Sequence, residues 1–205
     1  MTLRDRQRDH GRELIRDAAE ELFIANGYTT TPVTAIARRA GVAEKTVYNL
    51  FETKSGLLID LFRRRVLGEG DEAVANQHEQ VKTLNHPEEI IDEFCRINQQ
   101  VAERALPLLR VLLEASAVDS DVARLVTAQE EYRYEDQAYL LAALDSRGHL
   151  RTDQPLEELQ RSLWLAAAPE LVIKAIDAGW SIEHHREWTK QVLTALLLPN
   201  PDTEV

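Results

Sequence analysis

The 205-residue sequence predicts an all-α fold with a small N-terminal domain of short helices and a larger helical C-terminal domain. Three observations lead to this prediction. Apolar residues recur at helical spacing through most of the chain, and no segment shows the alternation and β-branched enrichment of a half-buried strand. Near the N-terminus, two short helical patterns are joined by a tight turn at Gly41.

The first helix is predicted by pairs of apolar residues that recur every four positions. These pairs are Leu14 and Ile15, Ala18 and Ala19, and Leu22 and Phe23. Gly27 ends the helix because glycine readily adopts the left-handed conformation that follows many helices. Upstream, Arg4, Arg6 and Arg8 are expected in a disordered tail, with an arm in the DNA minor groove as the alternative.

Three short helices follow in the N-terminal domain. A helix over 32–40 is predicted with Thr31 as its N-cap and Pro32 at its first position. Gly41 ends it, and a helix over 43–51 comes next. Thr53 caps the last of the three, which carries apolar residues as far as position 66.

The C-terminal part shows longer helical patterns, several of which begin at prolines. We predict helices over 87–104, 106–117, 120–145, 155–179 and 182–198. Pro169 should kink or split the pattern in which it lies. Residues 146–149 are predicted to form a turn, and residues 199–205 a frayed tail.

Composition bounds the class of protein. The chain is 44% hydrophobic and 29% charged, which excludes a disordered or fibrous protein. The single cysteine, Cys95, excludes an intrachain disulfide and favours a reducing compartment. We expect a cytoplasmic protein with no membrane segment, because the N-terminus shows no secretory signal and the most apolar stretch, 163–169, is short.

The net charge of −11 is spread unevenly along the chain. Residues 1–65 carry +3, whereas residues 66–205 carry −14. This asymmetry suggests that the two parts have different partners and that only the first part attracts nucleic acid. An acidic surface with chance variation is the alternative.

The helices over 32–40 and 43–51 have the features of a helix-turn-helix motif, in which the second helix lies in the DNA major groove. Small or β-branched apolar residues, Ala37 and Val47, stand where the helices cross, and Gly41 permits the turn. The outward face of the second helix is polar. An ordinary αα-hairpin remains the alternative at this point.

A wider set of residues is similar to the N-terminal domain of the TetR family of transcriptional regulators. These residues are the segments 18–23, 27–37, 40–43 and 46–48, together with Phe51 and Lys54. The resemblance covers about residues 10–62. We therefore divide the chain into a DNA-binding domain over 1–53 and a ligand-binding and dimerisation domain over 54–205.

The resemblance implies a ligand-responsive regulator, most simply a repressor that a small molecule releases from a palindromic operator. Its partners would be double-stranded DNA, an effector of unknown identity and a second copy of the chain. Two alternatives are a regulator of the same fold that responds to a protein partner or to no ligand, and a thiol enzyme using Cys95. Since the chain has no phosphate loop, nucleophile elbow or metal motif, we expect no enzyme and no cofactor.

Seven residues are candidate DNA contacts: Thr31, Thr34, Lys45, Thr46, Tyr48, Asn49 and Lys54. The resemblance assigns Tyr48 and Lys54 to the DNA backbone. Lys45, Thr46 and Asn49 lie on the second helix, where lysine can bond guanine and asparagine adenine. Thr31 and Thr34 are candidates for phosphate, although Thr31 could be a cap alone.

Three residues depart from the family pattern. Pro32 stands where serine or threonine is frequent, and Glu52 stands where proline is usual. Ala43 stands at a common serine position, so the second helix of the motif loses a side-chain cap worth about 1 kcal/mol.

The C-terminal domain offers candidates for an effector site and a dimer interface. Aromatic, thiol and amide side chains on predicted helices suggest ligand contacts, and Tyr139 is a further aromatic residue of this kind. Each of these side chains could equally fill an ordinary core. The ligand candidates are Phe94, Cys95, Asn98, Tyr132 and Trp164. The dimer candidates form a four-helix bundle with the partner, with an intramolecular hairpin as the alternative. They are Leu156, Leu159, Leu163, Trp188, Val192, Leu196 and Leu197.

Overall fold

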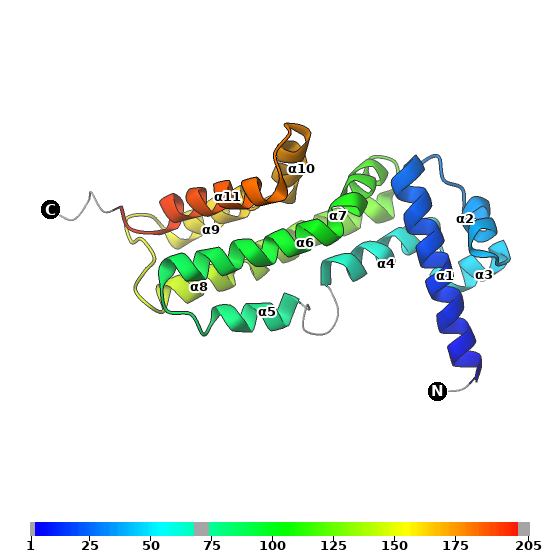
Figure 1. The fold of residues 1–205 in the computed structure, drawn as a ribbon, viewed down its shortest axis with the longest axis horizontal. Coiled ribbons are helices and arrows are strands. Elements are labelled where there is room, and N and C mark those ends of the chain that lie inside the picture. The colour runs from blue at the N-terminus through cyan, green and yellow to red at the C-terminus, as the bar shows by residue number, and fades with distance from the viewer. Residues whose placement is uncertain (1–2, 68–73, 201–205) are drawn as a thin grey trace. The chain divides into compact units, whose positions relative to one another are not determined.

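The structure is a computed structural model that describes residues 3–67 and 74–200. The described residues form helices and no strand, which confirms the all-α prediction (Figure 1). The helices are α1 (Leu3–Asn26), α2 (Val33–Ala40), α3 (Glu44–Phe51), α4 (Lys54–Leu67), α5 (Val74–Val81), α6 (Pro87–Ser116), α7 (Ser120–Asp136), α8 (Ala138–Asp145), α9 (Leu156–Ala166), α10 (Pro169–Asp177) and α11 (Ile182–Leu197).

The chain forms two compact units. The first comprises residues 1–65 and 105–128, and the second comprises residues 66–104 and 129–205. Both α6 and α7 therefore contribute residues to each unit. The division into a DNA-binding domain over 1–53 and a ligand-binding and dimerisation domain over 54–205 concerns function and stays a prediction.

The first unit is built around side chains that α1 to α4 bury completely. They include Ile15 and Phe23 of α1, Ile36 of α2, Val47 of α3, and Leu57 and Leu58 of α4. These residues repeat at helical spacing, so each helix presents one apolar face to a common core. Gly27 and Gly41 have φ of +83° and +69°, as the predicted turns require.

Two expectations for this unit are corrected. α1 begins at Leu3, so the basic residues predicted for a disordered tail lie on its first turns. α2 has Pro32 rather than Thr31 at its N-cap position, and no side chain caps it. The Thr31 hydroxyl instead donates backwards to the carbonyl oxygens of Leu22 and Gly27.

The connection from α3 to α4 is short and strained. Glu52 has φ 63° and ψ −50°, and the Thr53 N–H donates to the Phe51 carbonyl at 2.7 Å. This is a γ-turn with positive φ, a conformation that residues other than glycine rarely adopt. The Thr53 hydroxyl accepts the Gly56 N–H at 2.8 Å, so Thr53 caps α4 as predicted.

The second unit buries an apolar core in which α5, α6, α8, α9 and α11 all take part. Among its completely buried residues are Val81, Ile90, Phe94, Leu140, Leu163 and Leu193. Asp92 of α6 forms ion pairs with Arg186 and Lys190 at 2.7 and 3.0 Å, which fixes α11 on α6.

Several predicted helix boundaries were wrong. The helices expected over 87–104 and 106–117 form one helix, α6, because Pro107 is exposed and the carbonyl that it leaves without a helical donor can reach water. The helix expected over 120–145 is divided at Gln137, and α5 was not predicted. Pro169 splits the next helix at the first position of α10, as predicted.

None of the described helices is both long enough and apolar enough to cross a lipid bilayer.

Candidate nucleic-acid interface

The crossing of α2 and α3 depends on small side chains and on the turn at Gly41. Ala37 and Ala40 of α2 and Val47 of α3 are all buried. The Gly41 N–H donates to the Arg38 carbonyl and the Val42 N–H to the Ala37 carbonyl, which satisfies the last turn of α2. These bonds fix the direction in which α3 leaves the turn.

α3 keeps its polar side chains on the face opposite the core. Lys45, Tyr48 and Asn49 are exposed, and Thr46 is half-buried. Tyr48 is 44% exposed, although an aromatic ring of this size is ordinarily placed in a core. The buried apolar face of this helix stays in the core, while its exposed face carries lysine, amide and phenol groups. The helix can therefore enter a DNA groove without any unfolding of the domain.

Arginines from α1 hold the C-terminal end of α3. The Arg12 guanidinium donates to the Leu50 carbonyl at 3.0 Å and lies 5.1 Å from the centre of the Phe51 ring. Arg16 donates to both carboxylate oxygens of Asp60 on α4, at 2.7 and 3.0 Å. The hydrogen bond to Asp60 raises the pKa of Arg16.

The two threonines predicted to meet phosphate differ in position. Thr34 is exposed on the first turn of α2, where the first N–H groups of a helix have no partner within it. Thr31 is 2% exposed; its hydroxyl donates inwards and its N–H donates to the Tyr28 carbonyl at 3.2 Å. Because both donors of Thr31 are used inside the domain, it serves this loop and not phosphate.

Lys54 opens α4 and is half-buried. Its ammonium group donates to the Tyr28 carbonyl and lies 4.1 Å from the centre of the Tyr28 ring. Burial lowers the pKa of Lys54, while Asp119 and Glu114 act in the opposite direction. An ammonium group has three hydrogens, so it can bond to a phosphate oxygen while it keeps the bond to Tyr28.

Residues 15–61 match the family model described as bacterial regulatory proteins, tetR family. This part of the chain is similar to that family. Over 52 residues, the chain is 44% identical to the fatty acid metabolism regulator protein of Bacillus subtilis (strain 168). That alignment covers 25% of this chain and 27% of the relative, so the chain spans about a quarter of that curated protein.

Solved structures share the fold beyond the segment that matches this family model. SmeT, the repressor of the Stenotrophomonas maltophilia multidrug efflux pump SmeDEF, is 18% identical with a TM-score of 0.71, over 93% of this chain and 91% of SmeT. The fatty acid degradation regulator FadR from Bacillus halodurans is 21% identical with a TM-score of 0.69, over 91% and 94%. A Saccharomonospora viridis protein in complex with choline is 19% identical with a TM-score of 0.71, over 92% and 98%. At these identities the likeness shows the fold.

The predicted ligand residues of the second unit lie on α6, α7 and α9 and differ in burial. Phe94 and Cys95 are enclosed in its core, and the Asn98 amide donates to the Phe94 carbonyl at 2.9 Å. Burial raises the pKa of the Cys95 thiol to about 12, so it stays protonated and unreactive near neutral pH. Tyr132 is 53% exposed, which does not suit a residue expected in an enclosed pocket.

Several buried polar atoms of this unit have no hydrogen-bond partner among the described residues, and two of them belong to tyrosine and tryptophan side chains. These two are the Tyr139 hydroxyl and the Trp164 indole nitrogen. The Tyr139 ring stacks on His78 with centres 4.0 Å apart, and its centre lies 5.8 Å from that of Phe94. The Arg133 guanidinium lies 5.0 Å from the centre of the Trp164 ring. No sequence pattern pointed to His78, which lies on the unpredicted α5.

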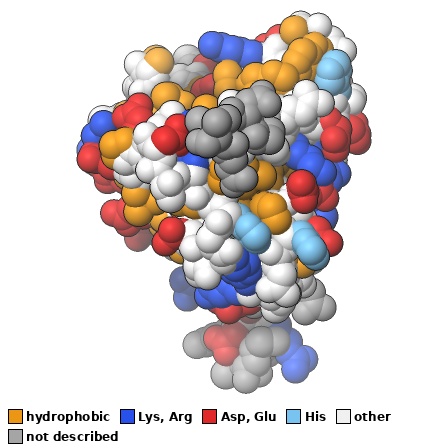
Figure 2. Space-filling model, turned by 90° about the vertical axis from the view of Figure 1, so that its left-hand side faces the viewer, with side chains coloured by type: hydrophobic (Ala, Val, Ile, Leu, Met, Phe, Trp, Pro, Cys, Tyr) orange, Lys and Arg blue, Asp and Glu red, His pale blue; other side chains and the backbone are white. Residues whose placement is uncertain are grey.

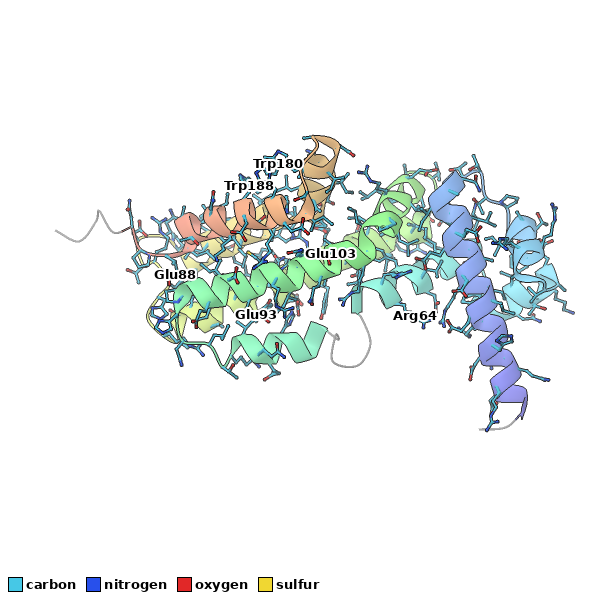
Figure 3. All side chains as sticks on the ribbon, in the orientation of Figure 1. Arg64, Glu88, Glu93, Glu103, Trp180 and Trp188 are labelled. Atoms are coloured by element: carbon cyan, nitrogen blue, oxygen red, sulfur yellow. The ribbon has the colours of Figure 1, made fainter. Side chains whose placement is uncertain are left out.

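The predicted dimer residues separate into two groups. Leu159, Leu163 and Leu197 are enclosed in the core of their own unit, so they cannot form a surface. Leu156 is 56% exposed, while Val192 and Leu196 are partly buried against that core. Trp188 meets Trp180 edge-on with ring centres 6.2 Å apart (Figure 3). Helical spacing identified apolar positions but did not say which of them face inwards.

Two histidines, His184 and His185, are adjacent in the sequence. His184 stacks on Trp180 with ring centres 4.2 Å apart, and His185 is buried. Across the described residues, no three histidine, cysteine, aspartate or glutamate side chains are placed to hold a metal ion.

Proposed function

We propose that this protein is a DNA-binding transcriptional regulator that binds a palindromic operator as a homodimer and is released by a small-molecule effector. The observation that carries the proposal is the exposed polar face of α3, with Lys45, Tyr48 and Asn49, in a helix-turn-helix domain that is similar to the TetR family. The surplus of +3 over residues 1–65, in a chain of net charge −11, supports the same assignment. Such a protein would act in the cytoplasm, where its DNA lies.

In this proposal, one set of residues binds the DNA backbone and another set recognises the base pairs. Lys54 and Tyr48, together with Thr34 and the start of α2, would bind phosphate, which carries no sequence information directly. Lys45, Thr46 and Asn49 would meet base edges in the major groove. Two copies would place their α3 helices about 34–36 Å apart along the DNA, or a multiple of that distance.

The homodimer would form through exposed apolar side chains of α9 and α11. Leu156 and Leu165 of α9 are 56% and 60% exposed, and Trp188 lies half-buried on α11. Figure 2 shows hydrophobic side chains gathered along the upper edge of the face that it presents. Large exposed apolar side chains on these two packed helices support a surface that another chain covers.

The effector site would lie in the second unit. Buried polar groups almost always have a hydrogen-bond partner, so the Tyr139 hydroxyl and the Trp164 indole support a bound molecule with acceptor atoms and an apolar body. SmeT has been crystallised with triclosan and the Saccharomonospora viridis protein with choline. The high pKa of Cys95 gives no support to a thiol enzyme, because catalysis would need the thiolate.

The first prediction distinguishes a residue that binds phosphate from a residue that recognises a base. Lys54→Ala should weaken binding to all DNA sequences alike, and a dimer should lose about two units of slope in a plot of log affinity against log salt. Lys45→Ala should relax the preference at one base pair per half-site, at a cost of roughly 1–3 kcal/mol for the best sequence. The measurement is binding to an operator selected from random DNA and to its single-base variants, over a salt series.

Lys174→Ala, an identical change at an exposed position on α10, is the control and should bind like the unchanged protein. If Lys45→Ala weakens every variant equally while Lys54→Ala changes base preference, the two roles are reversed.

The second prediction concerns the dimer. Replacing both Leu156 and Leu165 by glutamate should give monomers in sedimentation, because two charges cannot be buried without partners in an apolar interface. Both residues are more than half exposed, so the fold should survive the change. Val118→Glu, at a residue that is 67% exposed in the other unit, is the control and should remain a dimer. An intact dimer in the double variant would show that this surface is not the interface.

The third prediction concerns the effector. In a thermal-shift screen of a chemical library that includes triclosan, choline and long-chain fatty acids, at least one compound should raise the melting temperature and release the selected DNA. Tyr139→Phe should weaken that compound about tenfold, since it removes one buried hydroxyl. Tyr48→Phe, the same change at an exposed residue of the first unit, is the matched control for effector binding. A library without any hit would favour the alternative regulator that answers to a protein partner or to no ligand.

A further inference from the structure

Three segments of the first unit meet around Tyr28. They are the loop from α1 to α2, which contains Tyr28, the start of α4 at Lys54, and the turn between α6 and α7. Tyr28 is 5% exposed, so it cannot itself form part of an exposed DNA-binding face.

Tyr28 joins Lys54 to Asp119 through three of its groups. Its main-chain carbonyl accepts a hydrogen bond from the Lys54 ammonium, and its ring face lies 4.1 Å from the same nitrogen. Its hydroxyl donates to the Asp119 Oδ2 atom at 2.6 Å. A cation over an aromatic ring and a hydroxyl on a carboxylate are both favourable and directional. The position of the Lys54 ammonium therefore depends on where the Tyr28 ring is held.

Asp119 is itself fixed by the start of α7. Its other oxygen, Oδ1, accepts the N–H groups of Asp121 and Val122 at 3.0 and 3.4 Å, so it caps the helix. One carboxylate therefore serves α7 with one oxygen and Tyr28 with the other. Those hydrogen bonds hold the pKa of Asp119 below its usual range despite its burial.

The end of α6 approaches the same loop. The Glu114 carboxylate lies near the Thr29 N–H, and a Cβ atom on Gly27 would come within 2.8 Å of its Oε2 atom. Glu114 and Asp119 both favour the charged form of the half-buried Lys54. The loop, the lysine and the turn thus form one polar junction inside the first unit.

A lysine held in this way can bind phosphate at a smaller entropic cost. A free lysine side chain loses much of its rotamer freedom when it is ordered. At Lys54 that freedom is already restricted by the ring and carbonyl of Tyr28 before DNA arrives.

We propose that Tyr28 is a positioning residue for DNA binding: fixed by Asp119 at the start of α7, it holds the Lys54 ammonium group where the DNA backbone meets α4. The inference rests on the proposed DNA-binding function. It adds a residue that does not touch DNA, and it places the turn between α6 and α7 in control of a phosphate contact.

The test is a double-mutant cycle between Tyr28 and Lys54. Tyr28→Phe keeps the ring and removes only the hydroxyl. It should weaken binding to the selected operator about fivefold, as for one lost hydrogen bond, and should lower the salt slope. In a Lys54→Ala background the same Tyr28→Phe change should have no further effect, because the group that it positions is gone. A merely structural role would weaken both backgrounds alike.

Asp119→Ser tests the other end of the link. Serine caps helices as well as aspartate does, so α7 should remain intact, but serine is too short to reach the Tyr28 hydroxyl. Removal of a carboxylate also changes the general attraction to DNA, so the comparison is made within this background. Tyr28→Phe added to Asp119→Ser should leave the operator affinity unchanged. If Tyr28→Phe folds poorly, Asp119→Ser replaces it in the first cycle: it should lower the salt slope when Lys54 is present and leave the slope unchanged in the Lys54→Ala background.

Tyr134→Phe, the same chemical change on α7 in the second unit, is the control and should bind DNA normally. Failure of the unchanged protein to select any DNA would overturn the proposed function itself. If the unchanged protein binds and Tyr28→Phe binds equally well, or weakens binding equally with and without Lys54, the positioning role is wrong.

Discussion

The rest of the first unit depends on the burial of one face of α3. Helices of eight residues are marginal in water, so α3 persists because Val47 and Phe51 are packed against α1 and α2. Arg12 adds a bond to the last turn of α3, and Arg16 ties α1 to α4. Since only the buried face of α3 takes part in packing, its exposed face can carry side chains that contact DNA. A rigid helix with an uncommitted polar face is what the reading of base edges requires.

The domain uses buried polar contacts to fix residues that lie close to that face. The Thr31 hydroxyl ties its loop to the end of α1, and Thr53 caps α4 beside a γ-turn at Glu52. Tyr28 and Asp119 place a half-buried lysine at the start of α4. Among the described residues, Glu52 is the only one other than glycine with positive φ, and it lies where the orientation of α3 and α4 is set. Backbone strain of this kind is typical of functional regions.

The sequence predicted features that depend on local backbone chemistry. Gly27, Gly41 and Pro169 stand where the structure turns or divides, because positive φ and the missing proline N–H act on their own residue. Features that depend on tertiary packing were not predicted. Helical spacing could not show that Leu159, Leu163 and Leu197 face the core, and the proline rule failed at Pro107, which is exposed. The polar face of α3 was predictable from pattern, but the link from Lys54 through Tyr28 to Asp119 joins residues far apart in sequence.

The central claim is that α3 enters the major groove, and protection of guanine N7 from methylation tests it most directly. Guanine N7 lies in the major groove, whereas adenine N3 lies in the minor groove. On an operator selected by this protein, bound protein should protect guanine N7 in two patches about one helical turn, or a multiple of one, apart. Methylation of adenine N3 within those patches should continue. Protection of adenine N3 with unprotected guanines would contradict the account.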